Sequence, residues 1–212
     1  MNRREARVFL DTNMLIFAMQ YHKENVFEWI ELLYGNVWIH MDVLAELLQG
    51  RAIVEREIRQ RNWQIFDTSK LTANEKVIYA SYVAEIKNAF RQMNLKRAAQ
   101  GKRAKNTADI GEIATLAVCL LEDAQLICSD DADIQTVVRQ EQYSYIDVDG
   151  AQHLIAQDSA EDFCFYCVVE AGIAKTKARH FYKTLFEDAT VRAHKLAALD
   201  TRFRAYMAFE KS

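Results

Sequence analysis

The sequence predicts an α/β fold in which a parallel sheet is covered by helices on both faces and is followed by a C-terminal helical extension. Short apolar runs alternate along the chain with longer stretches of helical pattern, an order typical of parallel sheets flanked by helices. The 212 residues, of which 50% are hydrophobic, suffice for one domain with a substantial core. There is no proline and there are only six glycines, so little interrupts long helices. We place a three-layer α/β domain at residues 1–155 and a helical appendage, packed on or beside it, at residues 156–212.

Five short apolar runs have the length and composition of strands. They occupy residues 6–10, 37–39, 63–66, 125–128 and 143–148. The first is followed by Asp-Thr-Asn and the fourth by Ser-Asp-Asp, so each delivers polar side chains at its carboxyl end. The fifth alternates weakly between apolar and polar residues, and we expect it to be the last strand.

Helical patterns fill the segments between these runs. We expect helices at about residues 14–18, 23–33, 42–48, 52–61, 72–99, 108–121 and 134–140, and helices alone from about residue 160 onward. In the longest of them, four apolar residues are spaced to form a single stripe: Ile78, Tyr82, Ile86 and Phe90.

The composition excludes several classes of protein. The longest uncharged apolar run, about residues 113–121, is far shorter than the ~20 residues that cross a bilayer, so we expect no membrane partner. Asp11 breaks the apolar stretch near the start, so we expect no secretory signal. Four cysteines are too few for a disulfide scaffold, which favours a cytoplasmic location. The net charge of −3 gives no overall basic field, and the common glycine-rich nucleotide-binding motifs do not occur.

Acidic residues gather at predicted strand ends and helix starts. Asp11 follows the first strand, and Asp130 and Asp131 follow the fourth. Ligands of open α/β sheets bind outside the carboxyl ends of strands, so these positions are candidate site residues. Asp109 and Glu112 are three residues apart and therefore share one face of a predicted helix.

Carboxylates that are brought together repel one another, and their pKa values rise unless a cation neutralises them. Mg²⁺ takes a few carboxylates together with water and phosphate oxygens, and two such ions about 4 Å apart can hold both oxygens of a phosphodiester displacement. These acids, with Glu46 on the same helix face as Asp42, suit metal-dependent phosphoryl chemistry. Each acid also has a purely structural interpretation: an Asx turn for Asp11, a helix-dipole contact for Asp109, an N-cap for Asp131 and a solvated helix face for Glu46.

Four stretches of the sequence resemble the motifs of the PIN-domain ribonucleases. They are Val-Phe-Leu-Asp-Thr-Asn-Met-Leu at residues 8–15, Val-Leu-Ala-Glu-Leu at 43–47, Asp-Ile-Gly-Glu-Ile-Ala-Thr-Leu-Ala at 109–117 and Leu-Ile-Cys-Ser-Asp-Asp-Ala-Asp-Ile at 126–134. The resemblance spans about residues 7–150 in the order the family shows. It implies a parallel sheet flanked by helices, with an acidic pocket that binds Mg²⁺ or Mn²⁺ and cleaves single-stranded or exposed RNA.

The resemblance also assigns roles to individual residues. The catalytic acids would be Asp11, Glu46, Asp109 and Asp131. The metal ligands would come from Asp11, Asp109, Glu112, Asp130 and Asp131. Supporting roles would fall to Thr12, Asn13, Ser129 and Asp133. The third acid is either Asp109 or Glu112, because both positions are used among relatives, and residues 160–212 match nothing in the minimal family domain.

A basic stretch precedes the helix that carries the third motif. Residues 87–105 contain seven lysines and arginines and no acidic residue. Phosphate backbones are bound mainly by such side chains, so we expect this stretch to guide RNA toward the acids. The expected RNA-binding residues are Lys96, Arg97, Lys102, Arg103 and Lys105. The structural alternative is a solvated helix end followed by a mobile loop.

The sequence thus favours a metal-dependent endoribonuclease that hydrolyses RNA phosphodiester bonds. The alternative is a catalytically silent module of the same fold that binds RNA or another protein. A phosphatase with Asp11 as its nucleophile is less favoured, since that chemistry pairs two aspartates and residue 13 is asparagine. Many small members of the family are toxins, which implies two partners besides the RNA substrate: a second copy in a homodimer and an antitoxin-like inhibitor.

Overall fold

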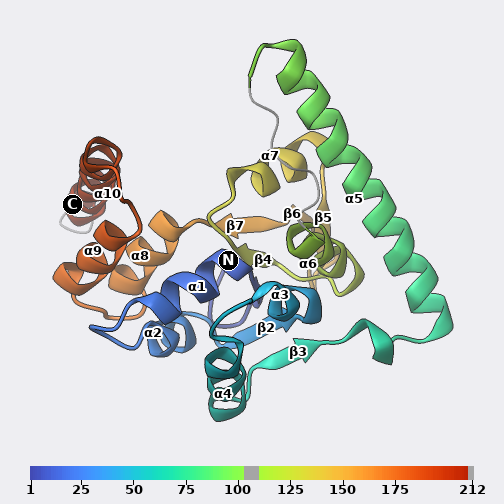
Figure 1. The fold of residues 1–212 in the computed structure, drawn as a ribbon, viewed down its shortest axis with the longest axis horizontal. Helices are drawn as coiled ribbons and strands as arrows, with labels where there is room; N and C mark the ends of the chain where they lie inside the picture. Colours follow the sequence, from blue (N-terminus) through green and yellow to red (C-terminus); the bar gives the residue numbers. More distant parts are fainter. Residues whose placement is uncertain (103–109, 210–212) are drawn as a thin grey trace.

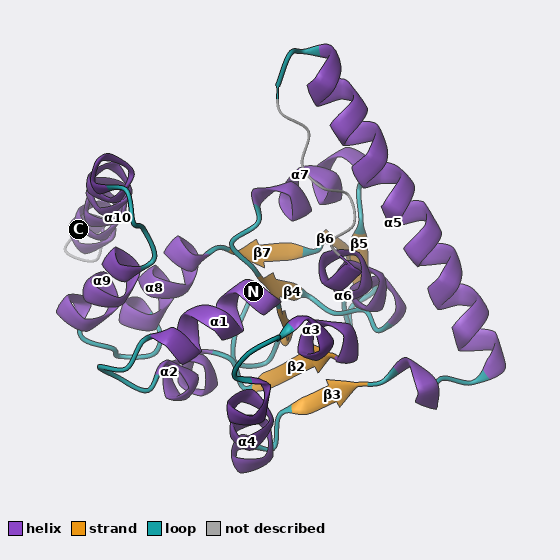
Figure 2. Cartoon of the chain, viewed as in Figure 1, coloured by secondary structure: helices purple, strands orange, loops and turns teal. Residues whose placement is uncertain are grey.

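A five-stranded parallel sheet forms the centre of the molecule (Figures 1 and 2). The computed structural model describes residues 1–102 and 110–209. The strand order is β3-β2-β1-β4-β7, with β1 (Arg7–Leu10), β2 (Asn36–His40), β3 (Gln64–Phe66), β4 (Leu126–Cys128) and β7 (Ala156–Asp158). Central β1 pairs in parallel with both β2 and β4. Because all neighbouring strands are parallel, their carboxyl ends meet at one edge, and this confirms the predicted α/β class.

Helices cover both faces of the sheet because successive residues of β1 point to opposite sides. Val8 and Leu10 belong to one hydrophobic cluster and Phe9 to the other. The first cluster receives residues from α1 (Thr12–Gln20), α2 (Val26–Leu33), α3 (Met41–Glu46) and α4 (Arg51–Arg61). The second receives residues from α5 (Ala73–Ala99), α6 (Ile110–Leu121) and α7 (Ala132–Glu141).

The chain ends in helices, as the sequence predicts from about residue 160. They are α8 (Ala160–Val169), α9 (Lys175–Thr184) and α10 (Ala189–Phe209). Phe163, Phe181 and Phe203, one from each helix, are buried in the same cluster as Val8 of the sheet. The C-terminal helices therefore extend the core of the first face, on the side of the molecule away from α5 (Figure 1).

The expectation for the last strand is wrong. Residues 144–146 form β5 (Ser144–Ile146), which pairs antiparallel with β6 (Gln152–Leu154) in a separate two-stranded sheet. Asp147 closes this hairpin by accepting hydrogen bonds from the backbone N–H groups of Asp149 and Ala151. The fifth strand of the main sheet is β7, whose Ala-Gln-Asp sequence carries no apolar signal. It lies just beyond residue 155, where we place the end of the α/β domain from sequence.

Helix α5 begins after a capping box, in which Thr72 and Glu75 satisfy each other's backbone N–H groups. A 3-10 turn, η1 (Thr68–Lys70), precedes it. Only the second half of the predicted apolar stripe is buried: Ile86 and Phe90 lie in the core, whereas Ile78 is 46% exposed. Among the described helices, none is both long and apolar enough to cross a membrane.

Candidate acidic site

The carboxyl edge of the sheet brings the first and fourth motifs together. Leu10 of β1 is in register with Cys128 of β4, and the Asp11 N–H donates to the Cys128 carbonyl at 3.1 Å. The Ser129 hydroxyl donates to Oδ2 of Asp11 at 2.8 Å and accepts the N–H of Asp131 at 3.1 Å. Ser129 is thus a buried bridge between the two segments that carry Asp11 and Asp131.

Asp11 occupies the N-cap position of α1 without capping the helix through its side chain. Its carboxylate is almost fully buried and also accepts a 3.3 Å hydrogen bond from the Asn13 amide. Burial raises the pKa of Asp11 to about 6, although the Ser129 hydrogen bond lowers it. The negative charges of Glu46 and Asp131 raise this pKa further, which places both acids within electrostatic reach of Asp11.

Asp131 is the N-cap of α7, as its structural interpretation predicts. Its Oδ1 atom accepts the N–H of Asp133 at 2.8 Å. Asp133 is buried and forms a bidentate ion pair with Arg97 at the end of α5, with Nη1 to Oδ2 at 2.6 Å. Asp133 therefore ties the first turn of α7 to the end of α5.

Glu46 ends α3 and is held by two other elements. The Thr12 hydroxyl donates to Oε2 of Glu46 at 2.6 Å, and the Gly111 N–H donates to Oε1 at 2.8 Å. Thr12 therefore contacts Glu46, whereas its neighbour Asn13 contacts Asp11. A Cβ atom on Gly111 would lie 2.7 Å from Oε2, so only glycine permits this approach.

Gly111 contacts a candidate acid, although no sequence motif assigns it a role of its own. It lies in the first turn of α6, inside the third motif, and the available signal is a glycine within an otherwise apolar helix. Glu112, the next residue, is half-buried in the same turn. Asp109, the other candidate for the third acid, lies outside the described residues.

Asp130 turns away from Asp11 toward the C-terminal helices. Its Oδ1 atom accepts the N–H of Ala160, at the start of α8, at 3.1 Å. Burial raises its pKa, and the charge of Lys195 lowers it. Asp130 and Asp131 therefore accept hydrogen bonds from different segments, the start of α8 and the first turn of α7.

The basic stretch divides into side chains with different surroundings. Lys96 and Lys102 are exposed. Arg97 is committed to Asp133, and this ion pair raises the pKa of its guanidinium. Arg103 and Lys105 lie outside the described residues.

Carboxylate and hydroxyl oxygens are ligand types that Mg²⁺ and Mn²⁺ prefer, and Asp11 and Ser129 supply one of each. A cation there would also offset the repulsion by Glu46 and Asp131, which adds to the effect of burial in raising the pKa of Asp11. Within residues 1–102 and 110–209, however, no three histidine, cysteine or acidic side chains are grouped so that they could hold an ion. No protein-family model and no curated protein matches this chain.

Proposed function

We propose that this chain is a Mg²⁺- or Mn²⁺-dependent endoribonuclease of the PIN-domain type. The observation that carries the proposal is the buried Asp11 carboxylate, which lies at the carboxyl edge of a parallel sheet within electrostatic reach of Glu46 and Asp131. Burying a carboxylate among like charges opposes folding, and such perturbed groups cluster at functional sites. A dication held between these acids would neutralise their charge and bind the oxygens of a phosphodiester.

In the proposed nuclease the acids and their hydrogen-bond partners have separate tasks. Asp11 and Asp131 would hold the metal ion together with Asp109 or Glu112. Ser129 and Asn13 orient the Asp11 carboxylate through their hydrogen bonds. When bound, the dication supplies charge neutralisation for the phosphoryl oxygens.

The remaining tasks concern water and RNA. Glu46 positions the attacking water, and the exposed Lys96 and Lys102 bind the RNA backbone. A homodimer and an antitoxin-like inhibitor belong to the same proposal and rest on the resemblance alone.

Cleavage of end-labelled single-stranded RNA tests this function. We expect the wild-type chain to cleave with Mg²⁺ or Mn²⁺ and to stop when EDTA is added. Asp11→Asn should lower the rate about 100-fold or more, as expected when a group that stabilises transition-state charge is lost. Asp149→Asn, which changes an exposed acid in the hairpin turn, is the matched control. Equal rates for Asp11→Asn and the wild type would refute the proposal.

A catalytically silent RNA-binding or protein-interaction module is the second candidate. It is favoured by the contacts of Glu46, since both of its carboxylate oxygens accept hydrogen bonds from the protein. Glu46 would then fasten α3 to α6. Calorimetric titration with Mn²⁺ separates the two candidates: millimolar or tighter binding that Asp131→Asn abolishes supports the enzyme, and no binding of Mn²⁺ with RNA binding intact supports the module.

A further inference from the structure

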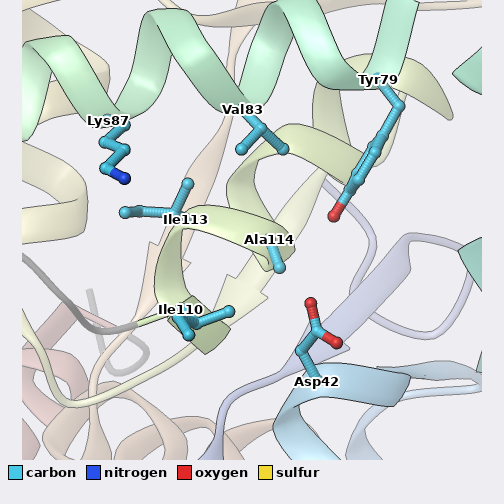
Figure 3. Close-up of a pocket in the computed structure, with 7 residues that line it drawn as sticks. All are labelled: Asp42, Tyr79, Val83, Lys87, Ile110, Ile113 and Ala114. Atoms are coloured by element: carbon cyan, nitrogen blue, oxygen red, sulfur yellow. The ribbon is translucent and has the colours of Figure 1, made fainter. Parts of the chain in front are cut away.

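A cavity of about 400 Å³ lies between α3, α5 and α6 (Figure 3). Its volume falls within the range of about 300–1,000 Å³ that is typical of small-ligand sites. Two of its lining residues adjoin the Glu46 contact. Asp42 precedes Glu46 by one turn of α3, and Ile110 precedes Gly111, whose N–H binds Glu46.

The walls of this cavity are apolar and come from two facing helices. Val83 projects from α5, and Ile110, Ile113 and Ala114 project from α6. Aliphatic walls on two facing helices favour a flat, weakly polar ligand, because such a ligand displaces water from the apolar surface of both helices. An unstacked base of single-stranded RNA has this shape.

One end of the cavity carries a hydrogen-bond acceptor and an oriented donor. The Asp42 carboxylate and the Tyr79 hydroxyl point toward the same space (Figure 3). Nδ1 of buried His40 accepts the Asp42 N–H at 3.0 Å, so in the neutral ring Nε2 carries the proton. Nε2 then donates to the Tyr79 oxygen at 3.0 Å, which leaves the Tyr79 O–H able to donate toward the cavity.

The other end is basic. Lys87 lies two helical turns beyond Tyr79 along α5, a separation of about 12 Å. Lys87 and Arg91 also line a neighbouring depression on α5. Exposed lysines and arginines in such a row bind phosphate groups.

We propose that this cavity is a nucleobase subsite that prefers guanine. Asp42 accepts hydrogen bonds from N1–H and N2–H of the base, Tyr79 donates to O6, and Lys87 pairs with the phosphate of the same nucleotide. The inference rests on the proposed ribonuclease function and adds a base preference to it. Bound here, a guanosine would place its strand beside Glu46.

The preference follows from the hydrogen-bonding edges of the four bases. A carboxylate offers only acceptors, and guanine presents two adjacent N–H donors to it. Adenine and cytosine each place a ring-nitrogen lone pair beside their amino group. Uracil places two carbonyl oxygens around its single N–H. Each of these three bases would therefore bring an acceptor against the Asp42 carboxylate.

Titration with the four nucleoside monophosphates in EDTA tests the subsite without any need for catalysis. We expect GMP to bind about tenfold more tightly than AMP, CMP or UMP, as for one bidentate contact to a base. Asp42→Asn should remove this preference. Val83→Trp should fill the cavity and weaken GMP binding, whereas Val77→Trp, at a position on α5 that is 71% exposed, should not. Circular dichroism melts would establish that each variant is folded.

The outcomes separate this inference from the proposed function. Equal affinity for the four nucleotides, no nucleotide binding, or GMP binding that Val83→Trp leaves unchanged would overturn the subsite. A chain that prefers GMP but cleaves no RNA would retain the subsite and refute the nuclease. If Asp11→Asn abolishes RNA cleavage but the four nucleotides bind equally well, the proposed nuclease is retained and the subsite is refuted.

Discussion

The backbone N–H of Gly111 donates a 2.8 Å hydrogen bond to Glu46, and a Cβ atom on Gly111 would lie 2.7 Å from the same carboxylate. The first turn of α6 therefore holds the Glu46 carboxylate of α3 by a backbone hydrogen bond, and this close approach is possible because Gly111 has no side chain. The group that would have to move is the end of a flexible side chain, so a substitution here should affect the site more than the stability of the fold.

Gly111→Ala should displace the Glu46 carboxylate and thereby lower the pKa of Asp11, because the charge of Glu46 contributes to raising it. The free energy of unfolding should change little, because the lost hydrogen bond costs about 1 kcal/mol and the higher helix propensity of alanine contributes about as much in the other direction. NMR titration of the Asp11 carboxyl carbon and urea unfolding measure the two effects. If Glu46 carries the effect, Gly111→Ala should change little in a Glu46→Ala background. An unchanged Asp11 pKa would contradict this account.

Asp11→Asn should stabilise the protein at neutral pH. The pKa of Asp11 is about 6 in the folded chain and about 3.9 when unfolded, so the folded state binds the proton more tightly. This contribution to stability is present below pH 4 and is lost as the pH rises through 6, by up to about 3 kcal/mol.

Urea unfolding between pH 4 and pH 7 measures this difference. The advantage of Asp11→Asn over the wild type should grow with pH across that range. The free energy of unfolding of Asp149→Asn, a change in the exposed hairpin turn, should depend on pH as that of the wild type does. The same pH slope in Asp11→Asn and the wild type would show that Asp11 titrates normally.

Mn²⁺ or Mg²⁺ should raise the melting temperature if the acids bind the ion in the folded state alone. At a concentration of 100 times Kd, the expected stabilisation is about 2.7 kcal/mol. Asp11→Asn and Asp131→Asn should reduce it, and EDTA should reverse it. Sodium chloride of equal ionic strength controls for screening. Equal stabilisation in all variants would place the ion elsewhere.

Arg97 and Lys96 are neighbours for which the structure predicts opposite effects. Arg97→Ala leaves the buried Asp133 without its bidentate partner, which should cost about 1.5–3 kcal/mol of unfolding free energy. Lys96→Ala, at an exposed position, should leave stability unchanged and weaken RNA binding with a smaller salt dependence. Urea unfolding and RNA titration at two salt concentrations measure both. Equal stability of the two variants would contradict the structural role of Arg97.

The strands of the structure differ in how well local sequence patterns predict them and their partners. Strands β1 and β4 are buried on both sides, so their apolar runs predict them and the residues that follow them. Strand β7 has a polar sequence and is defined by its backbone pairing with β4. The alternating residues 144–146 belong to a hairpin outside the main sheet, because alternation indicates a strand without naming its partner.

By itself, the sequence determined the α/β class and the positions of Asp11 and Asp131 after two buried strands, because burial patterns and strand ends are local properties of the chain. Only the tertiary structure decided that Gly111 holds Glu46, that Arg97 pairs with Asp133, and that a cavity opens between α3, α5 and α6. These contacts join residues that are far apart in the chain. Their distances depend on how whole helices pack, for which no short stretch of sequence carries a signal.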